Sequence, residues 1–88
     1  MTDNTAESLG MATAMLTRAM LQAAAADATA APILASLSLD CATPSQAQAT
    51  VAQARVTRAT RSIVFAQGEV RSPTGELILA GSAVFRLA

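Results

Sequence analysis

The segment RSPTGELILAGSAVFRLA, from Arg71 to Ala88, combines a turn with a long alternating run of residues. Pro73 suits the first corner of a tight turn, and Gly75 can adopt the positive φ that such turns often need. The residues after the turn then alternate with the period of a β-strand. The segment therefore predicts a β-hairpin whose second strand covers about residues 76–87. One face of that strand carries Leu77, Leu79, Gly81, Ala83, Phe85 and Leu87.

Three further segments have the alternation of strands. ILASLSLDCA predicts a strand over residues 33–42, and the weaker pattern from Gln48 onward predicts one over residues 48–58. RSIVFAQGEVR predicts a strand over residues 61–71, after a tight reversal at Ala59 and Thr60. We expect the four strands to form an antiparallel meander in which each strand pairs with the next.

The alternation also assigns faces to these strands. Cys41 falls on the apolar face of the first strand and is expected to be an inert buried thiol, because nothing cationic nearby favours the thiolate. The other members of that face are Ile33, Ala35, Leu37 and Leu39. In the third strand, Ile63 and Phe65 lie on the face opposite to Val64, Ala66, Gly68 and Val70.

The residues before Pro32 have the composition of one long helix. Asn4 and Glu7 have the spacing of a capping box and strong helix formers follow, so we predict a helix over about residues 5–26. Gly10 in its first turns costs about 1 kcal/mol relative to alanine, and we therefore expect it to mark a close backbone approach. The stripe expected to face the sheet consists of Leu9, Ala12, Leu16, Ala19 and Ala23.

Length and composition limit the class of protein. The chain has 88 residues, so we expect a single α+β domain over residues 1–88. A chain of this size buries only about 60–65% of its unfolded surface, which makes its own core marginal. Its hydrophobic content of 52% and mean hydropathy of +0.41 are high for a soluble monomer. Assembly with another copy is therefore expected.

Charge and residue counts exclude several functions. Six basic residues balance six acidic ones, and only Phe65 and Phe85 could stack on bases, so no nucleic-acid partner is expected. With one cysteine and no histidine, a Cys/His metal site or a Cys-His catalytic pair is excluded within one chain. No apolar run approaches the roughly 18–20 residues that span a bilayer, and the acidic start of the chain is unlike a signal peptide. We expect no membrane partner and a cytoplasmic location.

The strand segments resemble those of a known family. LSLDCATP (Leu37–Pro44) and ARVTRATRSIVFAQGEVRSPTGELILAGSAVFRL (Ala54–Leu87) are similar to the strand pattern of the hot-dog acyl-CoA thioesterases related to the phenylacetate-pathway enzymes. Thr60-Arg61 stands near the family's reversal, Pro73-Thr74-Gly75 at its turn, and Ala80 with Phe85 in its last strand. About half of the chain carries this resemblance.

The resemblance implies a hot-dog fold, in which one long helix packs on an antiparallel sheet. It also implies a homodimer or a dimer of dimers, with two sheets joined edge to edge and acyl-CoA sites at the subunit boundary. CoA would then be part of the substrate, and no separate cofactor or metal is expected. The family strand that precedes the helix is expected to be missing, since three residues stand before Asn4.

The chain departs from the family at the catalytic positions. Members carry a histidine two residues before a glycine, and an aspartate or glutamate seven residues after that glycine. If Gly10 is that glycine, Ser8 stands at the histidine and Thr17 at the acid. Thr17 could orient water, and backbone amides near Gly10 could polarise a thioester carbonyl, but neither Thr13 nor Thr17 is a base near neutral pH. Thr13 and Thr17 are equally consistent with helix packing.

The remaining candidate residues each have two interpretations. Glu7 and Asp40 are the nearest carboxylates, but Glu7 also suits a helix cap and Asp40 a solvated strand. Arginine is well suited to CoA phosphates, yet the arginines also suit a solvated sheet edge. The arginines in question are Arg55, Arg58, Arg61 and Arg71. The methionines Met11, Met15 and Met20 suit either an acyl tunnel or core packing.

Three functions are consistent with these residues. The first is a thioesterase-like protein that binds acyl-CoA thioesters between subunits and can hydrolyse them, although it lacks the family's usual acid. The second is a non-catalytic hot-dog homodimer that binds an acyl group or serves a complete paralogue. The third is an α+β dimerisation module unrelated to thioesters. The replacement of the family's histidine and acid by Ser8 and Thr17 favours the second.

Overall fold

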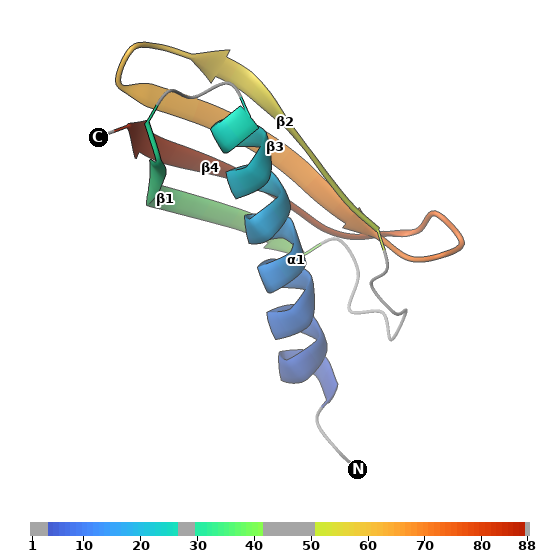
Figure 1. Ribbon diagram of the computed structural model, residues 1–88. Coiled ribbons are helices and arrows are strands. Elements are labelled where there is room, and N and C mark those ends of the chain that lie inside the picture. Colours follow the sequence, from blue (N-terminus) through green and yellow to red (C-terminus); the bar gives the residue numbers. More distant parts are fainter. Residues whose placement is uncertain (1–3, 27–29, 42–50, 88) are drawn as a thin grey trace.

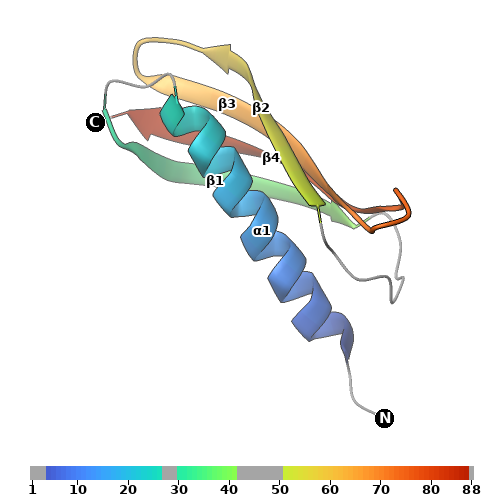
Figure 2. The same ribbon diagram turned by 45° about the vertical axis from the view of Figure 1, so that its right-hand side comes forward.

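The computed structural model describes residues 4–26, 30–41 and 51–87, and side chains from residue 10 onward. One helix, α1 (Asn4–Ala26), precedes four strands. The strands are β1 (Pro32–Cys41), β2 (Val51–Ala59), β3 (Ile63–Arg71) and β4 (Leu77–Leu87). They form one antiparallel sheet, and α1 lies across one of its faces (Figure 1, Figure 2). The predicted arrangement of one helix on a four-stranded antiparallel sheet is confirmed, while the predictions for residues 42 and 48–50 lie outside the described residues.

The order of the strands differs from a simple meander. Strands β2, β3 and β4 pair in sequence order, but β1 pairs with β4, which gives the order β1-β4-β3-β2. The prediction that β1 pairs with β2 is therefore wrong. Alternation of apolar and polar residues indicates which face of a strand is apolar. It does not indicate which other strand lies beside that strand in the sheet.

Both predicted reversals are present. Between β2 and β3, the hydroxyl of Thr60 accepts a hydrogen bond from the amide of Ile63 at 3.1 Å, and the Thr60 amide donates to the Ile63 carbonyl at 2.7 Å. Between β3 and β4, Gly75 has a φ of 89°, which a residue with a side chain rarely adopts. The buried Ser72 closes this turn by accepting a hydrogen bond from the Glu76 amide at 3.1 Å.

Two predictions for β1 are wrong, one on the faces of its first residues and one on the burial of Cys41. Leu34 is paired with Phe85 and Ser36 with Val84, so the alternation changes phase at Ala35. Leu34 consequently lies on the helix-covered face, and Ile33 lies on the opposite face from Leu37, contrary to the prediction. Cys41 is exposed rather than buried, because it ends an edge strand that α1 covers least.

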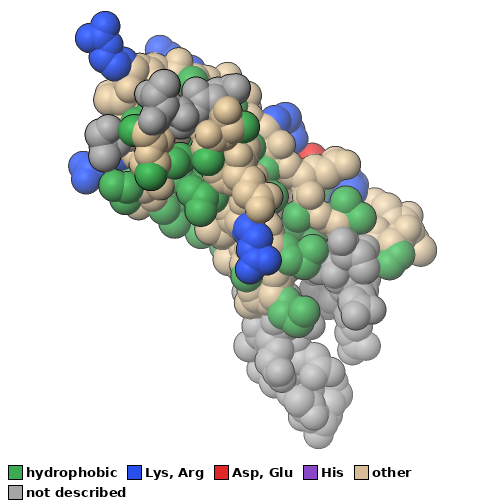
Figure 3. Space-filling model, viewed as in Figure 1, with side chains coloured by type: hydrophobic (Ala, Val, Ile, Leu, Met, Phe, Trp, Pro, Cys, Tyr) green, Lys and Arg blue, Asp and Glu red, His purple; other side chains and the backbone are tan. Residues whose placement is uncertain are grey.

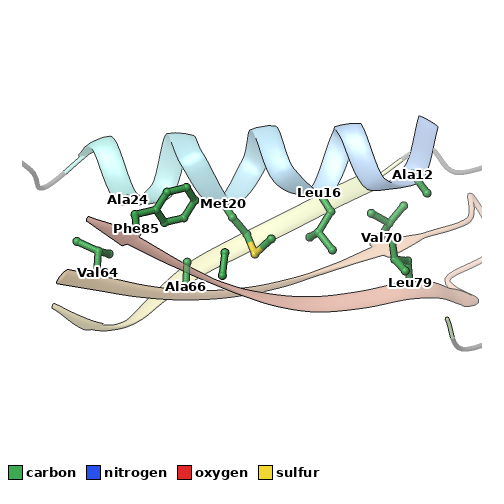
Figure 4. Close-up of a cluster of buried hydrophobic side chains, with 10 residues drawn as sticks. Ala12, Leu16, Met20, Ala24, Val64, Ala66, Val70, Leu79 and Phe85 are labelled. Carbon is green, nitrogen blue, oxygen red and sulfur yellow. The ribbon is translucent and has the colours of Figure 1, made fainter. Parts of the chain in front are cut away.

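The core lies between α1 and the sheet. Its helical members recur at every fourth residue and are Ala12, Leu16, Met20 and Ala24. Four residues exceed one helical turn, so this stripe rotates around the helix and follows the twist of the sheet. Figure 4 shows Ala12 above Val70 and Leu79, and Ala24 above Val64 and Phe85. The predicted stripe is right at Ala12 and Leu16, whereas Ala19 and Ala23 lie at its border and are half-buried.

The methionines of α1 differ in how deeply they are buried. Met20 is fully buried and packs in the core, Met15 is half-buried, and 66% of Met11 is exposed. Of the two roles considered for Met20, an acyl tunnel or core packing, the structure therefore shows core packing. The side chain of Leu9 lies outside the described residues. Within the described part of the chain, no helix is long and apolar enough to cross a membrane.

Two paired glycines bring α1 close to the sheet. Gly68 on β3 and Gly81 on β4 are cross-strand partners. A Cβ atom on Gly68 would lie 2.7 Å from Leu16 Cδ1, and one on Gly81 would lie 3.0 Å from Leu16 Cδ2. Leu16 therefore occupies a hollow that only glycines leave open. The close backbone approach predicted at Gly10 is not found, since a Cβ there would meet nothing within 4 Å.

Candidate functional site

An open groove runs between α1 and the edge strand β2. Its volume is about 630 Å³. Ala19 and Ala23 line it from α1, and Ala52 and Ala54 line it from β2. Their methyl groups are too short to fill the space between the helix and the strand. Gln22, Gln53 and Arg55 complete the lining. The groove therefore has an apolar floor of small side chains and a polar rim.

Arg55 lies at the edge of the groove, but its side chain points to the opposite, helix-free face of the sheet, because it alternates with Ala54 along β2. Its Nη1 atom lies 3.1 Å from Oε1 and 3.4 Å from Oε2 of Glu69, and 56% of the Arg55 side chain is exposed. This partner neutralises part of the charge but uses one of several N–H groups of the guanidinium. Glu69 points away from α1, because its neighbours Gly68 and Val70 are buried, so the Arg55 guanidinium lies on the side of the sheet away from the groove.

Thr13 and Thr17 lie on a different side of α1 from the groove. They are four residues apart on one helix face, and both are half-buried. Thr17 and Ala19 are two residues apart, which places their side chains about 200° apart around the helix. The two hydroxyls therefore do not line the groove.

Gly10 lies well inside the helix rather than at its start. Because α1 begins at Asn4, Gly10 is beyond the first four residues, whose amides are the ones left without a helical acceptor. The amide of Gly10 is thus committed to the helix and cannot serve as the oxyanion donor that the sequence suggested. Glu7 and Ser8 are also in α1, and the predictions on their side chains lie outside the described part of the structure.

The arginines predicted to meet CoA do not form one cluster. Arg58 is paired with Phe65, and Arg61 lies in the reversal between β2 and β3, so both are at the end of the sheet that lies under Ala24. Gly10 and Thr13 are at the other end of α1, and the helix between Ala12 and Ala24 is about 18 Å long. Within one protomer, the predicted catalytic and CoA-binding residues are therefore separated. The contact of Arg58 and Arg61 with CoA stays a prediction.

The described side chains supply binding groups more readily than catalytic ones. Glu69 is engaged by Arg55, Asp40 is exposed on β1, and Glu76 lies in a turn. Cys41 is exposed and forms no disulfide. Among the residues that the structure describes, no cluster of His, Cys, Asp or Glu could hold a metal ion. The groove can thus hold an apolar chain, but none of its lining side chains is a general base.

The groove is the feature of this site that sequence patterns do not reveal. Alanines at positions 19 and 23 look like an ordinary helix stripe, and Ala52 and Ala54 look like a weak strand. Only their juxtaposition leaves a space. The sequence signal that could have revealed the groove is a helix flank of alanines next to a strand face of alanines. Side chains as short as alanine leave a gap between two packed elements.

Solved structures with this arrangement are known. The BH2602 protein from Bacillus halodurans, solved with CoA, superposes with a TM-score of 0.80 and 18% sequence identity over 90% of this chain. An acyl-CoA hydrolase from Agrobacterium tumefaciens superposes with a TM-score of 0.71 and 27% identity, also over 90% of this chain. No family model matches this sequence, and neither does any curated protein.

These likenesses concern the fold. The present chain spans 57% of the length of the Bacillus protein and 35% of that of the Agrobacterium hydrolase. The helix, the antiparallel sheet and the agreement with these structures show that the chain has the hot-dog, thioesterase-like fold that its strand pattern resembles.

Proposed function

We propose that this protein binds an acyl-CoA-type thioester in the groove between α1 and β2. The observation that carries the proposal is the groove itself, whose floor is made of alanines from α1 and β2. An acyl or pantetheine chain suits the apolar floor. The fold is shared with a protein solved with CoA and with an acyl-CoA hydrolase, which supports a ligand of this class.

We further propose that this chain binds the thioester without hydrolysing it. Hydrolysis needs an attacking oxygen, an acceptor for its proton and a donor for the developing oxyanion. If Gly10 corresponds to the family's glycine, Thr17 takes the place of the acid, and a threonine hydroxyl does not accept a proton near neutral pH. The amide of Gly10 is used within α1. The cytoplasm is the proposed location, because a lone free cysteine suits a reducing compartment.

The functional unit is proposed to be a homodimer joined through β1. Both outer strands have one edge that pairs with no described strand. β2 carries the charged side chains of Arg55 and Arg58, which discourage pairing with another edge. β1 carries one charge, Asp40, and has an uninterrupted register from Ser36 to Cys41. An antiparallel β1 pair across a two-fold axis would join two sheets into one.

Binding and hydrolysis can be measured side by side. The protein is incubated with acyl-CoAs of different chain length while free CoA is followed, and its thermal stability is measured with non-hydrolysable analogues. We expect stabilisation without release of CoA. Release of CoA by the wild type would overturn the binding-only proposal, and if Thr17→Ala abolished that release, Thr17 would be assigned to the reaction.

The groove has a matched pair of test variants. Ala23 lines the groove, whereas Ala25 is exposed on the same helix. Ala23→Leu should fill the groove and remove the stabilisation by the analogue, and Ala25→Leu should retain it. Equal stabilisation of both variants would place the ligand elsewhere. If no analogue stabilises the wild type, the ligand class is wrong and the dimerisation module becomes the better description.

A further inference from the structure

The helix-free face of the sheet carries an apolar cluster at one end. Phe65 is the cross-strand partner of Val84, and Ile63 is the partner of Arg86. These side chains point away from α1, because their neighbours along the strands, Val64 and Phe85, are buried beneath the helix. Phe65 is 37% exposed, and Ile33 on the adjacent β1 is 54% exposed. This apolar surface is therefore open to solvent in the protomer.

Three arginines surround this cluster. Arg58 is paired with Phe65, Arg86 with Ile63, and Arg61 lies in the reversal between β2 and β3. All three are exposed, and none of them pairs with a carboxylate among the described residues. Figure 3 shows basic side chains at this end of the molecule. We call the surface formed by Ile63, Phe65, Val84, Arg58, Arg61 and Arg86 the arginine-rimmed patch.

Charge is distributed unevenly along the sheet. Of the other arginines, Arg55 is neutralised by Glu69, and Arg71 donates a hydrogen bond to the carbonyl of Gly75 at 3.1 Å. The carboxylates of the described strands and turns, Asp40, Glu69 and Glu76, lie toward the opposite end. The arginine-rimmed patch is therefore the part of this face where positive charge is left uncompensated next to apolar surface.

We propose that the arginine-rimmed patch docks an acidic amphipathic segment of a partner protein. The centres of protein interfaces are apolar and their rims polar, and aromatic residues and arginine are the types most enriched in them. Phe65 and Val84 would bury the apolar side of the segment. The guanidinium groups of Arg58, Arg61 and Arg86 would pair with its carboxylates, to which their planar N–H groups are well matched.

A second copy of this chain fits the patch less well. Placing two patches face to face across a two-fold axis would bring like charges together, which is unfavourable. In a second arrangement, the helix-free faces of two copies would stack with their strands running in opposite directions, so that the arginines of one copy approach the acids of the other. Phe65 of one copy would then face the polar Gln53 and Glu69 of the other, and its ring would lack an apolar partner. A membrane surface is also disfavoured, because three arginines attract anionic lipids only weakly.

The docking proposal is tested with defined probes on the full chain. A fluorescent helical peptide with leucines on one face and glutamates on the other is titrated with the protein, and its anisotropy is followed. The same peptide with lysine in place of glutamate serves as the charge control. We expect binding of the glutamate peptide only, weakened by salt. The double variant Arg58→Glu/Arg86→Glu should weaken it by about tenfold or more.

Two matched variants separate the patch from general effects of charge and apolar surface. Arg18→Glu reverses an exposed arginine on α1, and Met11→Ser removes an exposed apolar side chain there. Both should leave binding within about twofold, whereas Phe65→Ser should weaken it like the double variant. Circular dichroism confirms that each variant is folded.

Several outcomes would overturn the docking proposal. These are equal binding of both peptides, loss of binding in Arg18→Glu, and no binding of the glutamate peptide. Binding to vesicles of phosphatidylglycerol that depends on Arg58 and Arg86 would assign the patch to a membrane instead. Competition by free CoA would assign it to the nucleotide. None of these results depends on the groove, so the docking proposal and the proposed function fail separately.

Discussion

At the scale of single residues, the packing of α1 depends on one leucine and two glycines. The side chain of Leu16 is fully buried and rests where Gly68 and Gly81 face each other across β3 and β4. A Cβ on Gly68 would also lie 2.5 Å from the carbonyl oxygen of Gln53, which belongs to the backbone and cannot rotate away. The absence of two side chains thus sets how closely the helix approaches the sheet.

Alanine substitutions at glycines should have opposite effects at different positions. Gly68→Ala should lower the free energy of unfolding by about 1–3 kcal/mol, because the new methyl group overpacks the site beneath Leu16. Gly10→Ala should raise it by about 0.5–1 kcal/mol, because alanine favours the helix and nothing described lies within 4 Å of the new Cβ. Urea unfolding monitored by circular dichroism measures both. Equal destabilisation by the two variants would contradict the close approach at Gly68.

The ion pair between Arg55 and Glu69 should contribute little to stability. Because 56% of the Arg55 side chain is exposed, solvent and salt screen the interaction. A double-mutant cycle with Arg55→Ala and Glu69→Ala should give a coupling energy of about 0.2–1 kcal/mol, and this value should fall as salt is added. A coupling several times larger would mean that the pair is more enclosed than it is in the protomer.

At the scale of elements, β1 differs from the other strands in how little of it is covered. α1 lies mainly over β2 and β3. On β1, Leu37 and Leu39 are half-buried and pack at the border of the core, while Leu34 is 44% exposed even though its cross-strand partner Phe85 is fully buried. A strand with an open hydrogen-bonding edge and an uncovered apolar side chain is suited to pairing with a second copy.

A glutamate at the β1 edge should therefore disrupt assembly. Leu34→Glu would place a charge in the proposed contact between two β1 strands and should shift the protein toward the monomer. Val51→Glu is the matched control, since Val51 is 43% exposed at the start of the other edge strand, β2. Size-exclusion chromatography with light scattering measures the mass of each variant. A wild-type monomer, or dissociation by Val51→Glu alone, would rule out the β1 interface.

At the scale of the whole molecule, the protomer exposes more surface than a chain of its size normally does. Its accessible surface is 5622 Å², whereas about 4,800 Å² is expected for a folded monomer of this mass. The protomer is a thin layer of one helix on one sheet, and a second copy would cover part of the surplus.

Thermal stability should consequently depend on protein concentration. If unfolding is coupled to dissociation, the midpoint of thermal unfolding rises as the total concentration of protein rises. Differential scanning calorimetry over about a hundredfold range of concentration should show this increase for the wild type. Leu34→Glu should have a midpoint that is lower and independent of concentration. A constant midpoint in the wild type would contradict the dimer.

Much of the fold could be read from the sequence because the relevant signals are local. Gly75 adopts the positive φ that its turn required, and Thr60 closes the other reversal. The alternation of Val64 and Val70 with Phe65 predicted the correct faces of β3, because successive side chains of a strand always point to opposite sides. The resemblance of the strands to hot-dog thioesterases also led to the correct fold.

Only the tertiary structure decided what depends on contacts between distant segments. It placed β1 beside β4, shifted its register at Ala35 and left Cys41 exposed, because alternation in one strand does not specify its neighbour or its cover. It turned the buried stripe of α1 toward Met20 and Ala24, because a helix on a twisted sheet follows the twist. It also bound Arg55 to Glu69 and brought Arg58 and Arg61 together with Arg86 at the end of the sheet, since strand register rather than spacing along the chain determines which side chains meet.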